Sequence, residues 1–550
     1  MTPAPLSGLH TRRAWLLATG IALLAFWAAP HAQAAAPAPP TLDADVAHLM
    51  AVMKAPGVAV AIVKDGELVL AQGWGLRQMG SAERVDADTV FAIASNTKAF
   101  TAVVLAMLVD EGKLGWDDPV TKHLPAFQMS DPYVTREITV RDLLIHHSGL
   151  PLGAGDLLWV PPTTFSADEI VAAIRHLKPV RSFRSGYAYD NVLYVVAGQV
   201  IAAVTGKPWE DAVAERILRP LGMHATSAGL PGLLAANNRA APHSMDDGDN
   251  LAAHAPWATG NVLAATGLNA SANDMARWMT VLLDAGSLAS TGQPGRLYSE
   301  RRARELWSLW TPMQPSVPPP ALAATRSEFL GYGLGFQVAD YRGHKTVLHG
   351  GTLTGYTSRL LMLPALKLGI FVATNQWHSS SARRALVLRI ADHYLGVAPT
   401  DWVSLLHAVD IEERKQARAT VAAERAKRAT DAGAAGTAAD TPARTQAKTP
   451  KAYAGNYTDA WLGAATVAQE GELWTLRFAR SPGLVGDLEH WRGDIFIARW
   501  RDRSLNADAY VSFVLNPDAT VAEVRMKAVS AETDFSFDFH DLKLLPVAGR

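Results

Sequence analysis

A serine and a lysine three residues apart are the residues of this sequence best suited to chemistry. Ser95 and Lys98 stand where a short apolar run, residues 90–94, gives way to a long apolar segment, residues 99–109. At the start of a helix, residues with this spacing lie on one face, one above the other. A lysine can take the proton of a serine hydroxyl when burial and the positive end of a helix lower the lysine pKa. The spacing therefore predicts a nucleophile with its base, beside backbone N–H groups that can hold an oxyanion.

A helix cap with a solvated lysine is the simpler interpretation of this tetrapeptide when it is taken alone. A later segment supplies candidate partners just before an expected helix, Tyr189 and Asn191. A phenol near an ammonium group favours its ionised form, so Tyr189 is a candidate proton shuttle. Asn191 can hydrogen-bond Lys98 or a substrate amide. The alternative for this segment is a turn with an aromatic core residue.

A third segment, His349-Gly350-Gly351, ends an expected strand. Two glycines after a strand let a ligand approach the backbone closely, and His349 can donate to an anionic or carbonyl group. A loop glycine pair with an incidental histidine is the alternative. Each segment is weak evidence alone, so the inference rests on their order along the chain.

In chain order the three segments read S-x-x-K, Y-x-N and H-x-G, which resembles the serine β-lactamase and penicillin-binding protein superfamily. Residues 91–101 are similar to the family's nucleophile helix, residues 142–150 to its D-L-L-x-H-x-S-G-L segment, and residues 267–278 to another of its blocks. Tyr189 points to the class C-like branch, which includes D-aminopeptidases, D-Ala-D-Ala carboxypeptidases and esterases. The resemblance covers about residues 41–400.

The resemblance implies roles for individual residues. Ser95 would attack a carbonyl, with Lys98 and Tyr189 sharing the role of base, and the backbone N–H groups of Ser95 and Thr352 would hold the oxyanion. Water would then release the acyl group from Ser95. The implied substrate-binding residues are Asn191, His349, Gly350, Gly351 and Thr352.

The predicted function is a serine hydrolase that forms an acyl-enzyme with ester or amide substrates, of esterase, D-aminopeptidase or D-Ala-D-Ala carboxypeptidase type. Its substrate would be a small-molecule or peptide acyl compound. A true β-lactamase is the alternative among hydrolases, although His349 stands where class C enzymes carry the lysine of K-T-G. A non-catalytic penicillin- or peptidoglycan-binding receptor is the alternative outside enzymes, and it would not need Ser95, Lys98 and Tyr189 together.

Composition argues against several other functions. Lys and Arg number 51 and Asp and Glu number 52, so the net charge of -1 gives no sign of nucleic-acid binding. Cysteine is absent, which excludes thiol nucleophiles, thiolate metal sites and disulfides. The sequence contains no G-x-S-x-G and no H-E-x-x-H, and we predict neither a metal nor a cofactor.

The first residues have the features of a targeting segment. Arg12 and Arg13 precede an apolar run at residues 14–29 and small residues at 32–36. This predicts a signal peptide over residues 1–36, loosely of twin-arginine type, and a periplasmic or secreted protein without a mature transmembrane helix. An uncleaved anchor is the alternative, although the run is short for a membrane span. The sequence does not determine the oligomeric state.

Hydrophobic periodicity predicts the elements that position these residues. Two apolar runs around Asp65-Gly66 predict a β-hairpin. Helices are expected at 95–109, 140–147, 167–177, 191–204, 271–285 and 382–395, and strands at 332–338, 344–349, 357–363 and 369–374. Strands at both ends with helices between predict an α+β domain over residues 41–400, with an antiparallel sheet flanked by helices and an all-helical subdomain.

Beyond this domain, the amino-acid composition and the hydrophobic pattern of the sequence change twice. Residues 401–450 predict a charged helical and low-complexity linker, and residues 451–550 a small all-β domain, sandwich or barrel. The latter resembles the β-domain often appended to such hydrolases, and it is a candidate lid over the active site. Residues 152–164 and 223–256 are expected to form pocket walls. Trp159 and Trp257 are candidates to line the pocket, with a place in the buried core as the alternative.

Overall fold

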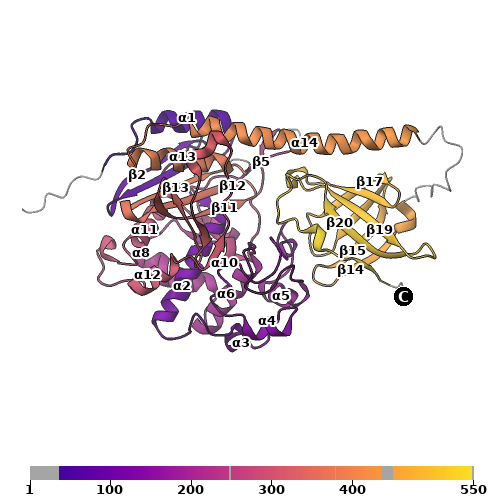
Figure 1. Cartoon of the computed structure of the whole chain (residues 1–550), viewed down its shortest axis with the longest axis horizontal. Coiled ribbons are helices and arrows are strands. Elements are labelled where there is room, and N and C mark those ends of the chain that lie inside the picture. Colours follow the sequence, from indigo (N-terminus) through magenta and orange to yellow (C-terminus); the bar gives the residue numbers. More distant parts are fainter. Residues whose placement is uncertain (1–35, 247–248, 378–379, 435–449, 548–550) are drawn as a thin grey trace, which may run out of the picture. The chain divides into compact units, whose positions relative to one another are not determined.

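The computed structural model describes residues 36–246, 249–377, 380–434 and 450–547 (Figure 1). The predicted signal peptide lies outside these residues, apart from its last position, so it stays a prediction, as does export. Among the described helices, none is by itself long and apolar enough to cross a membrane. The bent pair Val192–Thr205 and Trp209–Leu221 passes that test by length and composition alone.

The main domain is built on an eight-stranded sheet in which every neighbouring pair is antiparallel. Its strands, in spatial order, are β2 (Glu67–Gly75), β1 (Gly57–Lys64), β13 (Leu368–Thr374), β12 (Tyr356–Leu363), β11 (His344–Leu353), β10 (Gln337–Tyr341), β9 (Leu330–Tyr332) and β8 (Thr311–Met313). Strand β1 pairs with β13, more than 300 residues away, with Val58 opposite Thr374. The sheet therefore joins the two ends of the domain, as predicted.

Both faces of this sheet are covered, which explains the continuous apolar sequence of β1. Val58, Val60 and Ile62 pack in a core with α1 (Leu42–Met53), α13 (Ser380–Tyr394) and the start of α14 (Trp402–Ala434). Ala59, Ala61 and Val63 face the second, larger core, to which α2 (Thr97–Asp110), α6 (Val192–Thr205) and α11 (Ala272–Leu283) contribute. Strands buried on both faces lose the polar alternation of half-exposed strands.

A helical subdomain surrounds α2 and α6 (Figure 1). The shorter helices of this region are α3 (Val120–His123), α4 (Pro132–Glu137), α5 (Ala167–Ala173), α7 (Trp209–Val213), α8 (Arg219–Leu221), α9 (Gly229–Ala235), α10 (Leu263–Thr266) and α12 (Glu300–Leu306). Ser166 caps α5 with a capping box, and Gly206 ends α6 in the left-handed conformation. The predicted fold class, α+β with a helical subdomain, is confirmed.

The C-terminal domain is all-β, also as predicted, and it is barrel-like. One sheet contains, in spatial order, β20 (Val521–Ala528), β19 (Ala509–Leu515), β18 (Ile495–Trp500), β17 (Val485–Arg492), β16 (Leu473–Phe478), β15 (Gly463–Glu470), β14 (Gly455–Asp459) and β21 (Leu545–Pro546). Its two edges meet at a bridge between Val524 and Leu544, so the sheet nearly closes on itself. The predicted linker begins with α14, and its residues 435–449 lie outside the described residues.

The strand predicted at residues 332–338 is wrong. β9 ends at Tyr332 and β10 begins at Gln337, because the N–H of Gly333 donates to Phe336 O in a tight turn. Gly335 has a φ of 80°, and a Cβ there would lie 2.8 Å from the carbonyl oxygen of Lys98. The turn is therefore packed directly against α2, the helix that follows the predicted nucleophile.

Candidate active site

Ser95 lies in a short 3₁₀ turn, η1 (Ala94–Asn96), that leads directly into α2. Ala94 has a φ of 47°, a left-handed conformation that non-glycine residues adopt at an energetic cost and that is frequent at functional sites. Asn96, rather than Ser95, occupies the N-cap position of α2, and its Nδ2 donates to Ser358 Oγ at 2.8 Å. Ser95 therefore does not cap the helix, and its side chain faces a cavity instead.

Lys98 is completely buried one turn further along α2. Its Nζ lies 3.2 Å from Ser95 Oγ, 2.7 Å from Asn191 Oδ1 and 3.2 Å from Ala265 O. A neutral amine has two N–H groups and one lone pair. Because Asn191 and Ala265 supply two acceptors, the lone pair of the neutral amine is left for the hydroxyl of Ser95. With Lys98 in this neutral form, the Ser95 hydroxyl donates to Nζ, which is the polarity that a base needs.

Burial and the nearby charges set the proton affinity of Lys98. Burial disfavours the ammonium form and lowers the pKa of Lys98 to about 7, against the charges of Asp156 and Asp190, which raise it. Burial likewise raises the pKa of Asp156 to about 7. Asn191 links the two groups, since its Nδ2 donates to Asp156 Oδ2 at 2.9 Å. Lys98 and Asp156 thus have similar proton affinities near neutral pH, and the charge of each favours the ionised form of the other.

Asp156 is a site residue that the sequence motifs do not mark. It lies in the predicted pocket wall, residues 152–164, where Trp159 Nε1 donates to its Oδ1 at 2.9 Å. An aspartate at the start of a short 3₁₀ turn carries no sequence pattern that distinguishes it from a solvated one, and only the tertiary packing of this segment buries it. Among the two tryptophans considered for the pocket, Trp159 lines the cavity, whereas Trp257 packs against the core.

Tyr189 lies beside Lys98, with Nζ 4.8 Å from the centre of its ring. Burial raises the pKa of Tyr189 well above 10, and its hydrogen bond with Ser95 lowers it by less. This shift favours the neutral phenol, against the ionised form expected from the neighbouring amine. Tyr189 is a neutral hydroxyl in contact with Ser95, suited to passing a proton on rather than to starting the reaction as a phenolate.

His349 lies in β11 and is buried. Its Nδ1 lies 2.7 Å from Gly350 O and its Nε2 lies 2.7 Å from Tyr332 Oη, so Nδ1–H donates to the carbonyl and Nε2 accepts from the phenol. Burial and the charge of Lys98 lower the pKa of His349 to about 3. His349 is therefore neutral, and both of its ring nitrogens are engaged by the protein rather than aimed at a ligand.

The two glycines after His349 differ in what they allow. A Cβ at Gly351 would lie 2.1 Å from Ile93 O, so glycine is needed there for β11 to approach the turn that carries Ser95. Gly350 and Thr352 line the cavity. The glycine pair was predicted to admit a ligand, but at Gly351 the group that approaches is the protein's own backbone.

Six of the predicted residues line one cavity of about 330 Å³, and two do not. Ser95, Tyr189, Asn191, His349, Gly350 and Thr352 line it, whereas Lys98 and Gly351 are absent from its lining. Its remaining walls are Trp159, Tyr187, Gln337, Arg359, Arg383, Asp534, Phe535 and Ser536. Within the described residues, no three His, Asp or Glu side chains are grouped to hold a metal ion.

The C-terminal domain supplies one wall of this cavity. From the sequence, this domain was only a candidate lid over the active site. Phe535 stands edge-on to Tyr189, with ring centres 6.1 Å apart. Asp538 accepts the backbone N–H of Gly155 at 2.7 Å and that of Leu157 at 3.1 Å. These contacts attach the segment after β20 to the loop that carries Asp156. No motif marks this segment, because its role depends on a domain contact.

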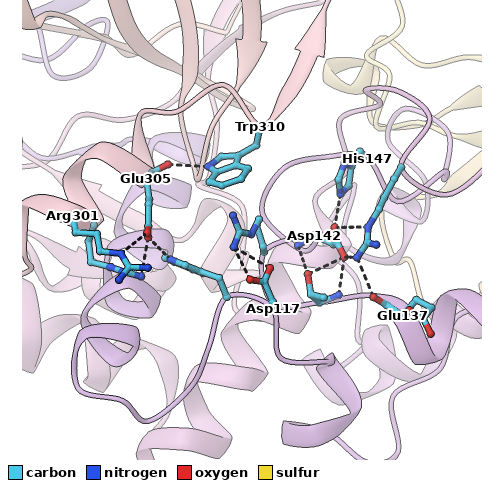
Figure 2. A network of polar contacts seen from close by, with 12 residues as sticks. Asp117, Glu137, Asp142, His147, Arg301, Glu305 and Trp310 are labelled. Carbon is cyan, nitrogen blue, oxygen red and sulfur yellow. Dashed lines mark hydrogen bonds and ion pairs between the residues drawn. The ribbon is translucent and has the colours of Figure 1, made fainter.

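A polar network fixes the segment that was predicted as a helix at residues 140–147 (Figure 2). Asp142 accepts from the N–H of Thr139 at 2.8 Å, from Arg184 Nε at 3.1 Å and from His147. Burial alone would raise the pKa of Asp142, but the hydrogen bonds from His147 and Arg184 outweigh it and lower this pKa to about 2. The carboxylate holds the chain in turns, so the helix prediction is wrong.

The same segment presents a buried histidine to the site. His146 has a φ of 57°, and its ring centre lies 4.3 Å from that of Tyr189. Burial and the charge of Lys98 lower the pKa of His146 well below its usual value.

Neighbouring polar contacts attach this region to α12 (Figure 2). Arg141 donates to Asp117 at 2.9 Å, and its guanidinium covers the ring of Trp310. Trp310 Nε1 in turn donates to the carbonyl oxygen of Glu305 in α12.

Comparisons with known proteins agree with this architecture. A family model described as beta-lactamase matches residues 42–395, and a model described as a domain of unknown function (DUF3471) matches residues 439–546. Unguisins hydrolase from Aspergillus campestris is 32% identical over 365 residues, which are 63% of this chain and 64% of that protein. Protein flp from Staphylococcus aureus is 30% identical over 190 residues, 34% of this chain and 37% of that protein. The chain thus spans less than two thirds of the length of these relatives.

Solved structures share the fold. The octameric penicillin-binding protein homologue from Pyrococcus abyssi superposes with a TM-score of 0.57 at 21% identity, over 92% of this chain and 99% of that one. A D-amino acid amidase from Ochrobactrum anthropi superposes with a TM-score of 0.52 at 22% identity, over 64% and 99%. Since the family model covers well over half of its residues, the chain belongs to the beta-lactamase family, whose members include serine hydrolases.

Proposed function

We propose that this protein is a serine hydrolase that cleaves ester or amide bonds through an acyl-enzyme on Ser95. The observation that carries the proposal is the contact between Lys98 Nζ and Ser95 Oγ, 3.2 Å long, with the amine completely buried. A buried amine with a pKa of about 7 is half deprotonated at neutral pH, where a base is most effective. The relatives named unguisins hydrolase support hydrolysis as the reaction class.

In the first half-reaction, Ser95 Oγ forms a bond to the substrate carbonyl carbon as Lys98 takes the hydroxyl proton. Backbone N–H groups of Ser95 and Thr352 hold the oxyanion. The hydrogen bond between Tyr189 and Ser95 gives the proton a path to the departing amine or alcohol. Collapse of the tetrahedral intermediate breaks the scissile bond and leaves the acyl group on Ser95.

In the second half-reaction, water takes the place of the leaving group. Lys98 accepts a proton from that water as its oxygen attacks the acyl carbon, and the proton returns to Ser95 when the acid product departs. His349 takes no part in proton transfer in this scheme, because its two nitrogens are engaged and its pKa is about 3.

Cavity size favours small acyl groups. Its volume of about 330 Å³ is at the small end of the range for ligand sites, and Phe535 and Trp159 contribute aromatic surface to its walls. A substrate with a short aromatic or aliphatic acyl group fits these dimensions. We therefore expect short esters and amides, including those of D-amino acids, ahead of large polymers.

A substrate panel tests the proposal. Wild-type protein, Ser95→Ala and the exposed control Ser182→Ala are assayed with p-nitrophenyl esters, D-aminoacyl amides, D-Ala-D-Ala peptides and a chromogenic β-lactam. We expect turnover of an ester or amide that falls about a thousandfold or more in Ser95→Ala and is unchanged in Ser182→Ala. Steady turnover of the β-lactam above all other substrates would favour a β-lactamase. Binding without turnover of anything would favour a receptor.

A further inference from the structure

One wall of the cavity beside Ser95 carries two uncharged polar side chains that the proposed proton transfers do not use. They are Tyr187, from the segment before α6, and Gln337, at the first position of β10. Tyr187 stands two residues before Tyr189, and both tyrosines line the cavity. A phenol and a carboxamide are therefore placed where part of the substrate must lie.

The fold holds both side chains in place. The partly buried ring of Tyr187 has its centre 5.9 Å from that of Tyr332 and 5.7 Å from that of His146. Gln337 pairs with Tyr332 across β9 and β10, directly after the tight turn that packs against α2. Tyr332 in turn bonds His349. The two polar groups thus have defined positions, as a binding subsite requires.

The side chains of Tyr187 and Gln337 have no hydrogen-bond partner other than each other among the described residues. Burial and the charge of Asp190 raise the pKa of Tyr187, while the neighbouring amide of Gln337 lowers it by less, so the phenol is neutral. An amide side chain has two N–H groups and two acceptor lone pairs, and a phenol has one O–H and can also accept. Whichever group donates to the other, the pair keeps at least one donor and one acceptor for a ligand.

A donor beside an acceptor matches a secondary amide, whose C=O accepts and whose N–H donates. An ester or a tertiary amide offers the C=O alone, so it leaves the acceptor of the pair unsatisfied. Polar groups without partners in a partly buried wall weaken binding, because they have lost water and gained nothing in exchange. The pair therefore favours a ligand that carries both groups of a secondary amide.

This polar wall lies on the side of the leaving group. Phe535 and Trp159 form the aromatic wall that suits the acyl group, and they come from other segments of the chain. In the proposed reaction, Tyr189 passes the proton to the departing amine or alcohol. The departing group is therefore beside the segment that also holds Tyr187.

We propose that Tyr187 and Gln337 form a subsite for a secondary amide in the leaving group of the substrate. A donor of the pair meets the C=O of that amide, and an acceptor of the pair meets its N–H. The proposal rests on the proposed hydrolase function and leaves its bond changes as they are. It narrows the substrate to compounds whose leaving group continues through a further amide bond, as in a peptide that is cleaved at an internal bond.

The test uses two phenylacetate esters with uncharged leaving groups, one of N-methylglycolamide and one of N,N-dimethylglycolamide. They differ by one methyl group, which replaces the amide N–H, and neither has a charge that Arg359 and Arg383 of the same cavity could distinguish. Both are assayed by release of phenylacetate with wild-type protein, Tyr187→Phe, Gln337→Met and the control Tyr133→Phe, at an exposed tyrosine outside the cavity lining.

We expect wild-type protein to prefer the N-methyl ester about tenfold or more in kcat/KM, since only this ester satisfies both groups of the subsite. Gln337→Met should lose the preference, because a thioether is a weak acceptor and no donor. Tyr187→Phe, which removes one hydroxyl, should lower kcat/KM for the N-methyl ester several-fold. Tyr133→Phe should match wild-type protein with both esters.

The outcomes separate this proposal from the hydrolase assignment. Equal kcat/KM for the two esters in wild-type protein, or a preference that survives in Gln337→Met, would overturn the amide subsite while the hydrolase stands. A failure of the hydrolase assignment appears instead as no Ser95-dependent release of phenylacetate from either ester. In that case, ligand-observed NMR compares binding of the two free alcohols, N-methylglycolamide and N,N-dimethylglycolamide. Tighter binding of the N-methyl compound, lost in Gln337→Met, supports the subsite, and equal binding overturns it.

Discussion

Lys98 Nζ lies 2.7 Å from the side-chain oxygen of Asn191, the shortest of its three polar contacts. This contact, with that to Ala265 O, occupies both N–H groups of the neutral amine and leaves its lone pair for Ser95. Asn191 thus orients the base as well as holding it, and its own amide is fixed in turn by Asp156. The proposed role of Lys98 as a base depends on this orientation.

Removal of the Asn191 amide should disorient the base. In Asn191→Leu the buried Lys98 loses an acceptor and Asp156 loses a donor, so we expect kcat to fall about tenfold to a hundredfold with a smaller change in KM. Steady-state kinetics on the best ester of the panel checks this. Asn261→Leu, which alters a partly buried asparagine outside the cavity lining, is the control. An unchanged kcat in Asn191→Leu would mean that Lys98 needs no orientation.

Activity should increase with pH around neutrality. The pKa of Lys98 is about 7, so the base is protonated and inactive below that pH and available above it. The titratable groups that face it are Asp156, Asp190, Tyr189, Tyr194, His146 and His349. Because the charge of Asp156 raises the pKa of Lys98, Asp156→Asn should shift the midpoint of kcat/KM to lower pH. A shift to higher pH, or none, would contradict this assignment of the titrating group.

The Phe535 wall should restrict the acyl group. Phe535→Ala removes a ring from the cavity without touching Ser95, so kcat/KM should increase several-fold for bulky acyl esters and change little for acetyl esters. A series of p-nitrophenyl esters of growing acyl size measures this. Phe329→Ala, at an exposed phenylalanine outside the cavity lining, serves as the control. An unchanged size profile in Phe535→Ala would show that the C-terminal domain does not limit the acyl group.

Asp538 should couple the two domains. Its carboxyl accepts two buried N–H groups, from Gly155 and Leu157, so Asp538→Ala leaves both without that acceptor. Each such loss costs about 1–3 kcal/mol, and we expect a lower Tm together with lower kcat, because the loop that carries Asp156 loosens. Thermal unfolding and kinetics measure the two effects. Asp518→Ala, in an exposed turn, should change neither. A reduced Tm with full activity would separate the domain contact from the site.

Much of the site follows from sequence because the chemistry is encoded in short motifs at fixed places in the fold. Ser95 and Lys98 are one helical turn apart. Asn191 precedes α6 and His349 lies in β11, so the order of strands and helices that the apolar pattern predicts is enough to bring these residues to Ser95. Asp156 begins a short 3₁₀ turn and Phe535 lies in a turn after β20, and only tertiary packing brings Asp156 to Asn191 and Phe535 to the cavity. Local sequence patterns do not predict contacts between segments that are far apart in the chain.

The errors have similar physical causes. Residues 332–338 look apolar enough for one strand, but Gly333 and Gly335 form a turn against α2. The segment 140–147 looks helical, but the side chain of Asp142 competes for its backbone and holds it in turns. The lowered pKa expected for Tyr189 is reversed by burial, a quantity that depends on the whole fold.

The nucleophile itself can be identified by mass spectrometry. Wild-type protein and Ser95→Ala are each treated with a fluorophosphonate, digested with a protease and mapped, with Ser148, in the same subdomain, as an internal comparison. We predict one modified serine, Ser95, labelled faster as the pH increases through about 7, and no labelling of Ser95→Ala. Modification of another residue in wild-type protein, or labelling that persists in Ser95→Ala, would contradict it.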